Sequence, residues 1–302
     1  MKNQDKIIIK IVSLSIISVF LIVYMSYMIL GNNKTNNNIS LLANLNITNN
    51  KLYSESFYNN VNNININSVR ANIIVSNSYD NMIHVSIYGK DKSYSVESKN
   101  ENLNINIDDK CNLICLNKKA HRIEVKIPEN YDKELYINNK YGNIDIEEFK
   151  YTNMIINNEI GNVSIFDVSH VKLNVKYGDI LINNADHAVI NALTGNIKVL
   201  EVDSINATNT NGNIKIDVIN ESLKIKNKTG NIELNEIKLK DNSSIENGYG
   251  DITIKNPYKL TINAKTELGK VTKDEELDDI SYDYTLTVRN KCGDIKIINY
   301  EK

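Results

Sequence analysis

The chain has 302 residues and is close to electrically neutral, with 35 Lys and Arg against 37 Asp and Glu. Only three of the basic residues are arginines, and they stand far apart in the sequence (Arg70, Arg122 and Arg289). Nucleic-acid binding needs a basic stripe, and bidentate capture of phosphate or carboxylate usually recruits Arg. The composition therefore excludes a nucleic-acid partner and disfavours a dedicated site for anionic polymers.

The first thirty residues predict a membrane anchor. Residues 11–30 form an unbroken run of twenty residues without a charge, preceded by Lys2, Lys6 and Lys10. Because twenty helical residues span a bilayer, we expect a cytoplasmic tail (1–10) and a single transmembrane helix (11–30). The positive-inside rule then places the N-terminus in the cytoplasm and the C-terminal domain outside the cell membrane. A cleaved secretory signal is the alternative, but the run is long for one and no A-x-A site follows it.

Residues 31–50 predict a solvated linker, since nine of these twenty residues are Asn. Between residues 51 and 127 the chain alternates as strands do, for example in Ile64-Asn65-Ile66, but without a repeated phrase. We expect this stretch to form irregular opening coils that cap a repeat structure, because terminal repeats are usually atypical.

Residues 128–302 carry a short repeat. A five-residue phrase recurs at intervals of 17 to 24 residues. It begins with Gly, continues in most cases with Asn or Asp, and ends with an aliphatic residue, any residue and a second aliphatic residue. A second alternating pair, such as Leu135 and Ile137, stands seven and five residues before the glycine. Each repeat therefore predicts two short strands with one buried face, and a period near 20 indicates a β-solenoid with one coil per glycine. The nine glycines are Gly142, Gly161, Gly178, Gly195, Gly212, Gly230, Gly250, Gly269 and Gly293.

Turn chemistry explains the repeat. Gly and the Asn or Asp after it both tolerate φ > 0, and Asn or Asp can bond its own backbone; only Lys270 breaks the series. Asn stands three residues before the glycine in six coils, where stacked amides could bond along the axis. An antiparallel sandwich with regularly spaced turns is the competing fold.

The entry into the repeats resembles a known family. The strand Arg122-Ile123-Glu124-Val125-Lys126-Ile127-Pro128, followed by Tyr141-Gly142-Asn143-Ile144-Asp145-Ile146, is similar to the bacterial putative-adhesin β-solenoid domains. The likeness covers roughly Ile64 to Tyr300. It implies an all-β solenoid, tethered to the membrane of a Gram-positive cell and sometimes encoded beside envelope-stress regulators. It carries over no catalytic residues.

No constellation in the sequence predicts a catalytic, cofactor or metal site. Cys111 and Cys115 could form a small disulfide, remain thiols or, least favoured, hold a metal ion, and Cys292 occupies a packing slot. The histidines lack zinc spacing, so each is expected at a polar surface, although His170 and His187 are one coil apart and could stack. The acidic stretch 274–279 lacks the spacing of a calcium loop and indicates a solvated loop.

These patterns favour a non-catalytic, adhesin-like interaction or scaffold module outside the membrane. An accessory sensor of envelope stress that works with a membrane partner, and a glycan-cleaving β-helix, are the alternatives. Little chain follows the last glycine, so we expect Asp294 to Tyr300 to form a terminal coil with an uncovered edge. Partners would then be a protein or another envelope component, or a second copy bound through the C-terminal coil.

Overall fold

The structure, a computed structural model, describes residues 49–90, 92–108, 120–274 and 282–299. The expected tail, transmembrane helix and most of the linker lie outside the described residues, as do Cys111 and Cys115. Every regular element within the described ranges is a β-strand. None of the described residues belongs to a helix long and apolar enough to cross a membrane. The expectation of an all-β fold for the repeat region is confirmed.

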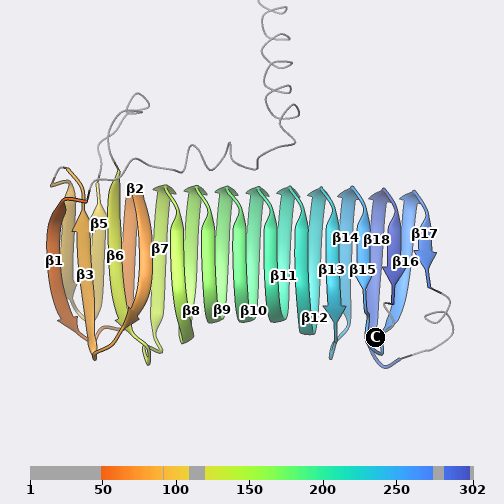
Figure 1. Ribbon diagram of the computed structural model, residues 1–302, viewed down its shortest axis with the longest axis horizontal. Coiled ribbons are helices and arrows are strands. Elements are labelled where there is room, and N and C mark those ends of the chain that lie inside the picture. Colours follow the sequence, from red (N-terminus) through yellow and green to blue (C-terminus); the bar gives the residue numbers. More distant parts are fainter. Residues whose placement is uncertain (1–48, 91, 109–119, 275–281, 300–302) are drawn as a thin grey trace, which may run out of the picture. The chain divides into compact units, whose positions relative to one another are not determined.

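The centre of the solenoid consists of coils that are each one long, bent strand (Figure 1). The two short strands expected per coil are therefore continuous there. In the centre the bent strands are β8 (Ile144–Ile160), β9 (Val163–Tyr177), β10 (Ile180–Thr194), β11 (Ile197–Asn211) and β12 (Ile214–Thr229). A further long, bent strand, β2 (Asn63–Ser78), lies near the N-terminal end.

Nearer the two ends the coils divide into separate strands. At the N-terminal end these are β1 (Lys51–Tyr58), β3 (Met82–Tyr88), β4 (Tyr94–Lys99), β5 (Asn102–Ile107), β6 (His121–Pro128) and β7 (Glu134–Tyr141). At the C-terminal end they are β13 (Ile232–Ile237), β14 (Ser243–Tyr249), β15 (Ile252–Lys255), β16 (Thr261–Leu268), β17 (Val271–Lys273), β18 (Thr285–Cys292) and β19 (Ile295–Ile298).

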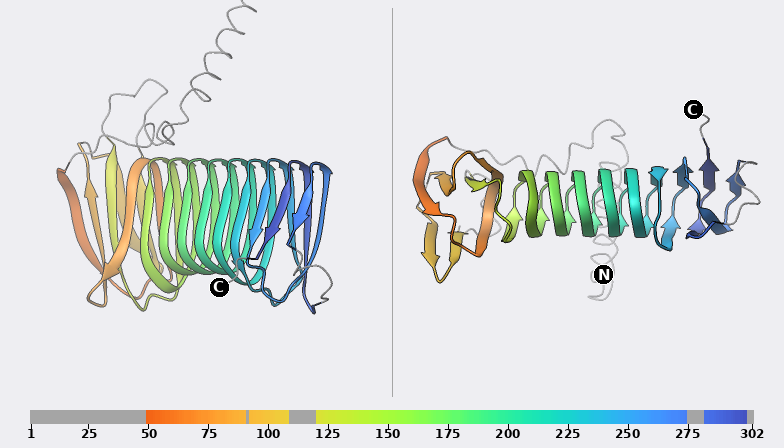
Figure 2. Two further views of the ribbon diagram at one scale, coloured as in Figure 1. Left: turned by 45° about the vertical axis from the view of Figure 1, so that its right-hand side comes forward. Right: turned by 90° about the horizontal axis from the view of Figure 1, so that it is seen from below.

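The coils stack to give two parallel faces with the core between them (Figure 2). We call the half of a coil before its glycine face A and the half after it face B. Successive coils pair in parallel on both, with Leu173 opposite Ile190 on face A and Val163 opposite Ile180 on face B. Side chains alternate inward and outward along each half, so each coil contributes aliphatic residues to one continuous core.

The predicted aliphatic stack is confirmed. The residues two positions after the glycines form one row, in which each lies opposite its counterpart in the next coil and is at most 1% exposed. The row consists of Ile144, Val163, Ile180, Ile197, Ile214, Ile232, Ile252 and Ile295. The residue that follows each of them points outward. The repeat phrase thus encodes one buried row on face B.

The glycine turns are confirmed, but their Asn and Asp side chains bond differently from the expectation. A Cβ on Gly161, whose φ is 138°, would lie 2.0 Å from the carbonyl oxygen of Gly142 in the adjacent coil, so only glycine fits. Asn143 does not bond its own turn; its Oδ1 accepts from the backbone NH of Asn162 at 3.0 Å, and Asn162 Oδ1 accepts from Asp179 in turn. These bonds link coil to coil along the axis.

The Asn residues three positions before the glycines are buried, and their amides bind mainly backbone groups. Asn158 Nδ2 donates to the carbonyls of Gly161 at 2.8 Å and Gly142 at 3.1 Å. A direct amide contact joins Asn139 Nδ2 to Asn158 Oδ1 at 3.3 Å. Because the turn carbonyls point into the protein, these amides stabilise polar groups that would otherwise be costly to bury.

The expectation that the C-terminal coil has an open edge is wrong. β18 and β19 are inserted between two earlier coils: β18 pairs with β14 on one side and β16 on the other, and β19 pairs with β15 and β17. In this position Ile295 and Ile297 are fully buried, whereas Val271 in the outermost strand β17 is 43% exposed. The insertion thus covers the aliphatic side chains of β19 from both sides.

At the N-terminal end a strand is likewise inserted between others of the chain, and antiparallel strands cover this end. β2 lies between β5 and β7 on face A and between β6 and β8 on face B. Beyond them, β4 pairs antiparallel with β5, while β3 and then β1 continue from β6. Tyr53, Phe57 and Tyr94 pack against the core there. His121, expected at a polar surface, is 1% exposed, and its ring lies against Gly89, where a Cβ would be 2.4 Å from it.

Candidate functional site

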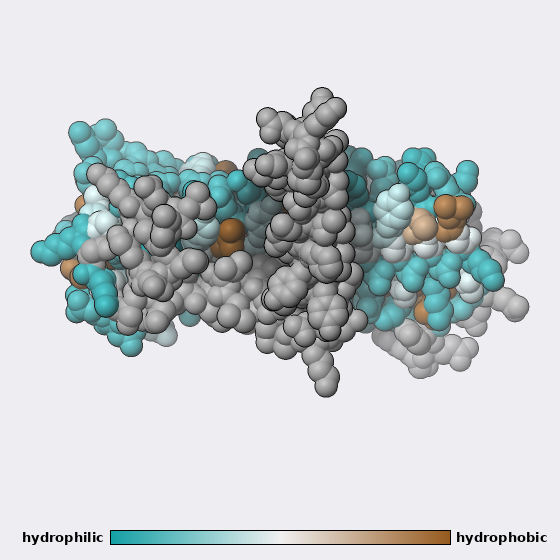
Figure 3. Space-filling model, turned by 90° about the horizontal axis from the view of Figure 1, so that it is seen from above, coloured by the Kyte–Doolittle hydropathy of each residue, from teal (hydrophilic) through white to brown (hydrophobic). Residues whose placement is uncertain are grey.

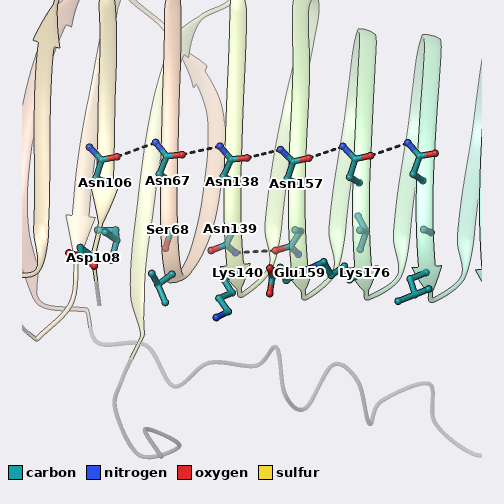
Figure 4. A pocket seen from close by; sticks show the side chains of 18 residues that line it. Asn67, Ser68, Asn106, Asp108, Asn138, Asn139, Lys140, Asn157, Glu159 and Lys176 are labelled. Atoms are coloured by element: carbon teal, nitrogen blue, oxygen red, sulfur yellow. Dashed lines mark hydrogen bonds and ion pairs between the residues drawn. The ribbon is translucent and has the colours of Figure 1, made fainter. Parts of the chain in front are cut away.

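A ladder of six asparagines runs along the outer surface of face A, four residues before the glycines (Figure 4). Each side chain donates its Nδ2 hydrogen to the Oδ1 of the next, at distances from 2.6 to 3.1 Å, always in the same direction. In order of donation the ladder is Asn191, Asn174, Asn157, Asn138, Asn67 and Asn106. Asn106 then donates to Ser95 on β4 at 3.3 Å. Aligned amides polarise one another, so the ladder is a stiff row.

The geometry of the coils places this ladder. In face A the residue three before the glycine is buried, so the residue four before it must point outward. Asn occupies this outward position in four successive coils of the repeat, and strands β2 and β5 add Asn67 and Asn106 by pairing in register. Sequence reasoning missed the ladder because it concentrated on the buried Asn. The signal was the Asn-Asn dipeptide at 138–139 and 157–158.

A groove of about 740 Å³ lies beside the ladder, between it and the outward residues two before the glycines. Six coils contribute to it. The rim opposite the ladder consists of Val69, Asp108, Lys140, Glu159, Lys176 and Leu193. Figure 4 shows Lys140, Glu159 and Lys176 following one another along this rim. Buried residues between the two rows, among them Val175 and Ala192, complete the lining.

The groove has no dominant charge. Lys176 Nζ lies 3.0 Å from Glu159 Oε1 in the neighbouring coil, and Lys140 and Asp108 add one charge of each sign. The remaining surface of the groove combines amide groups with partly exposed aliphatic side chains such as Leu193, which is 40% exposed. Such a surface can hydrogen-bond and pack against an elongated ligand.

A second polar cluster lies on the N-terminal strands and includes His84, which the sequence placed at a polar surface. Ser56 Oγ is 2.7 Å from His84 Nδ1, and His84 Nε2 is 2.9 Å from Asp80 Oδ1. Hydrogen bonds from Ser78, from His84 and from the backbone NH of Met82 lower the pKa of Asp80.

This cluster has the order of groups found in a Ser-His-Asp triad. However, the Asp80 side chain is 55% exposed, whereas a triad acts where water is excluded. Ser78 is the last residue of β2, and Asp80 lies in the turn between β2 and β3. Ser56 on β1 lies opposite His84 on β3. We therefore assign the cluster to the attachment of this turn to the terminal strands.

The other candidate residues do not converge on a site. His170 and His187 lie against each other on adjacent coils as expected, with ring centroids 4.7 Å apart and ring planes tilted by 43°. The described residues contain no group of three or more His, Cys, Asp and Glu able to hold a metal ion. Cys292 is free and partly exposed, opposite Tyr249 and Leu268 in the neighbouring coils.

Exposed apolar side chains are scattered over the described surface. In Figure 3 most of the described atoms belong to hydrophilic residues, with small hydrophobic spots between them. Two exposed apolar residues lie on β16 and β17, the outermost strands at the C-terminal end: Leu268 is 69% exposed and Val271 is 43% exposed. Isolated exposed residues are normal, but this pair lies on two strands whose outer edges pair with no other strand of the described residues.

The fold defines a class of protein, the two-faced parallel β-solenoid with glycine turns. The sequence profile of the family described as Toastrack DUF4097 matches residues 61–298, and the chain belongs to that family. The resemblance inferred from the repeats is thereby confirmed at the level of the family. No curated protein matches the sequence.

Solved structures similar to this chain include three bacterial proteins. A putative adhesin from Bacteroides fragilis is 18% identical, with 84% of this chain and 99% of that chain covered and a TM-score of 0.49. A putative lipid binding protein from Parabacteroides distasonis is 13% identical, with 83% and 98% covered and a TM-score of 0.49. A putative adhesin from Parabacteroides merdae is 14% identical, with 84% and 98% covered and a TM-score of 0.35. At these values the likeness carries no functional conclusion.

Proposed function

We propose that this chain is a non-catalytic, adhesin-like interaction module that presents a rigid β-solenoid outside the cell membrane. The observation that carries the proposal is the asparagine ladder with its groove on the outer surface of face A. A stiff array of polar groups repeated from coil to coil is suited to binding an extended partner. Rigidity reduces the conformational entropy that binding must overcome.

The membrane attachment rests on the sequence. Residues 11–30 are long enough to span a bilayer, and the lysines before them favour a cytoplasmic N-terminus. Residues 31–50, rich in Asn, would then separate the solenoid from the bilayer. A flexible chain of twenty residues reaches on the order of 25 Å.

Protease treatment of intact, wall-stripped cells tests this arrangement. The full chain should be retained in the membrane fraction, and external protease should digest the solenoid while a cytoplasmic control protein survives. Protection of residues 51–302 would reverse the topology. A soluble mature chain beginning near Gly31 would instead show that the apolar run is a cleaved signal.

Self-association, which we expected through the C-terminal coil, is proposed here for β16 and β17. In a parallel sheet, successive residues of a strand direct their backbone NH and C=O groups alternately to the neighbour on one side and to the other side. The NH of Thr261 donates to the carbonyl of Tyr284, directly before β18. The backbone groups of Ile262 and Ala264 therefore face away from β18. A substitution of Ala264 by Pro should abolish association in sedimentation of the detergent-solubilised full chain. A monomeric wild-type chain at high concentration would refute the idea.

A further inference from the structure

We propose that the groove beside the asparagine ladder binds an extended, electrically neutral glycan chain. The inference deepens the proposed function and rests on it, because the glycan must meet the solenoid outside the membrane. It follows from three properties of the site: its hydrogen-bonding groups, its length and its charge.

The ladder leaves matched donors and acceptors free for a ligand. An asparagine amide has two N–H hydrogens and an oxygen with two lone pairs. Within the ladder Asn157 donates one hydrogen to Asn138 Oδ1 and accepts one hydrogen bond from Asn174 Nδ2. Among the described residues, one donor and one acceptor therefore remain at each inner rung of the ladder. A sugar hydroxyl is also both donor and acceptor, so pairs of hydroxyls can bond successive rungs without leaving a polar group unsatisfied.

The length of the ladder favours a polymer over a small ligand. Neighbouring strands are about 4.8 Å apart, so the five steps from Asn106 to Asn191 extend over about 24 Å. The rungs are already fixed by bonds of 2.6 to 3.1 Å between side chains. An extended chain with repeated hydroxyls could therefore bind several rungs at once, with little loss of side-chain entropy in the protein.

The charges of the groove favour a neutral chain. Lys176 is paired with Glu159, and Lys140 and Asp108 balance each other in number. A polyanion would meet no net positive potential here, and a polycation no net negative potential. Leu193 and Val69 supply apolar contacts of the kind that the CH face of a sugar ring can cover.

Titration of the detergent-solubilised full chain with chitohexaose and with cellohexaose tests the proposal. Both probes are neutral, extended and soluble, and polygalacturonate serves as the anionic comparison. We expect saturable calorimetric binding of at least one neutral hexamer. The double variant Asn157→Ala and Asn174→Ala should weaken it by about tenfold or more, because two rungs lose their hydrogen bonds. The matched control Ser164→Ala and Lys198→Ala changes outward residues of face B and should bind as wild type.

The single variant Leu193→Ala keeps the test valid if the ladder variant fails to fold. Leu193 is 40% exposed and lies outside the ladder, so its loss should reduce affinity a few-fold while the thermal midpoint changes little. Absence of binding to both hexamers, equal binding by the ladder variant, or preference for polygalacturonate would overturn the proposal.

The result can be separated from the proposed function. If external protease digests the solenoid in cells but neither hexamer binds, the extracytoplasmic module stands and the glycan inference fails. If the solenoid is protected from protease, the proposed function fails whatever the purified chain binds.

Discussion

Substituting Ile295 and Val271 by Ala in separate variants tests the insertion of the C-terminal coil. Ile295 is 0% exposed and lies between Ile252 and Val271 in the stack. Its truncation should cost about 2 to 5 kcal/mol, the usual range for a buried Ile. Val271 is 43% exposed, and Val→Ala removes two methyl groups. At about 0.8 kcal/mol for each fully buried group, their partial burial gives about 1 kcal/mol.

Urea unfolding of the detergent-solubilised full chain measures both losses, and native-state hydrogen exchange locates them. Because repeat arrays can unfold from an end, a single urea midpoint does not show which strands are destabilised, whereas hydrogen exchange reports the stability of each strand. Backbone amides of β19 should exchange more slowly than those of β17. A larger loss for Val271 than for Ile295, or faster exchange in β19, would show that the C-terminal coil is at the end after all and would refute the insertion.

Three further predictions concern the coils. Ile197→Ala should cost about 2 to 5 kcal/mol in urea unfolding and the adjacent outward Lys198→Ala less than about 0.5 kcal/mol; equal losses would contradict the assignment of faces. Asn162→Ala should lower stability by about 1 kcal/mol because the NH of Asp179 loses its acceptor. Asn162→Asp keeps that acceptor, and thermal unfolding should rank it between wild type and the Ala variant. Hydrogen bonds from Lys255 and then Lys215 lower the pKa of Glu233 below its ordinary value of 4.5. The ionised Glu233 carboxylate therefore stabilises the folded chain above pH 4.5, and this stabilisation is lost on acidification. Thermal midpoints of wild type and Glu233→Gln should converge toward pH 3, and a difference that stays constant with pH would contradict this.

Local rules made the coils predictable from the sequence. Glycine at a turn with positive φ and aliphatics two and four residues later act within one coil, so Gly161, Val163 and Ile165 could be assigned without knowing their neighbours. The period then fixed the stacked rows. Even the contact between His170 and His187 followed from their separation of one coil.

The order of the coils depends on interactions between distant segments, and the sequence was misread there. Lys270 interrupts the series of Asn and Asp after the glycines. In the structure Asp294 Oδ1 accepts from the backbone NH of Lys270, so Lys270 donates the last hydrogen bond of the axial row among the described residues. A side-chain acceptor is not needed at the outermost coil. The exception at Lys270 was therefore the signal that this coil, and not the last one in sequence, lies at the end.

The candidate site was missed for a related reason. A ladder on the outer surface forms only between residues that lie opposite each other on neighbouring strands. Asn67 on β2 and Asn106 on β5 align with Asn138 only because β2 is inserted between β5 and β7. His121 was misplaced because its burial against Gly89 joins segments that lack the repeat phrase. Periodicity predicts neighbours one coil apart, but it cannot predict pairs created where the chain leaves the period.

Site-specific photo-crosslinking in intact cells tests the central claim, that the outer surface of face A binds a partner outside the membrane. A photoreactive residue placed at Lys140 or Leu193 lies on the rim of the groove, and one at Lys198 lies on the outer surface of face B. We predict crosslinks to an envelope component from the two groove positions and none from the control position. Crosslinks confined to Lys198, or crosslinks from the groove only to cytoplasmic proteins, would contradict the account.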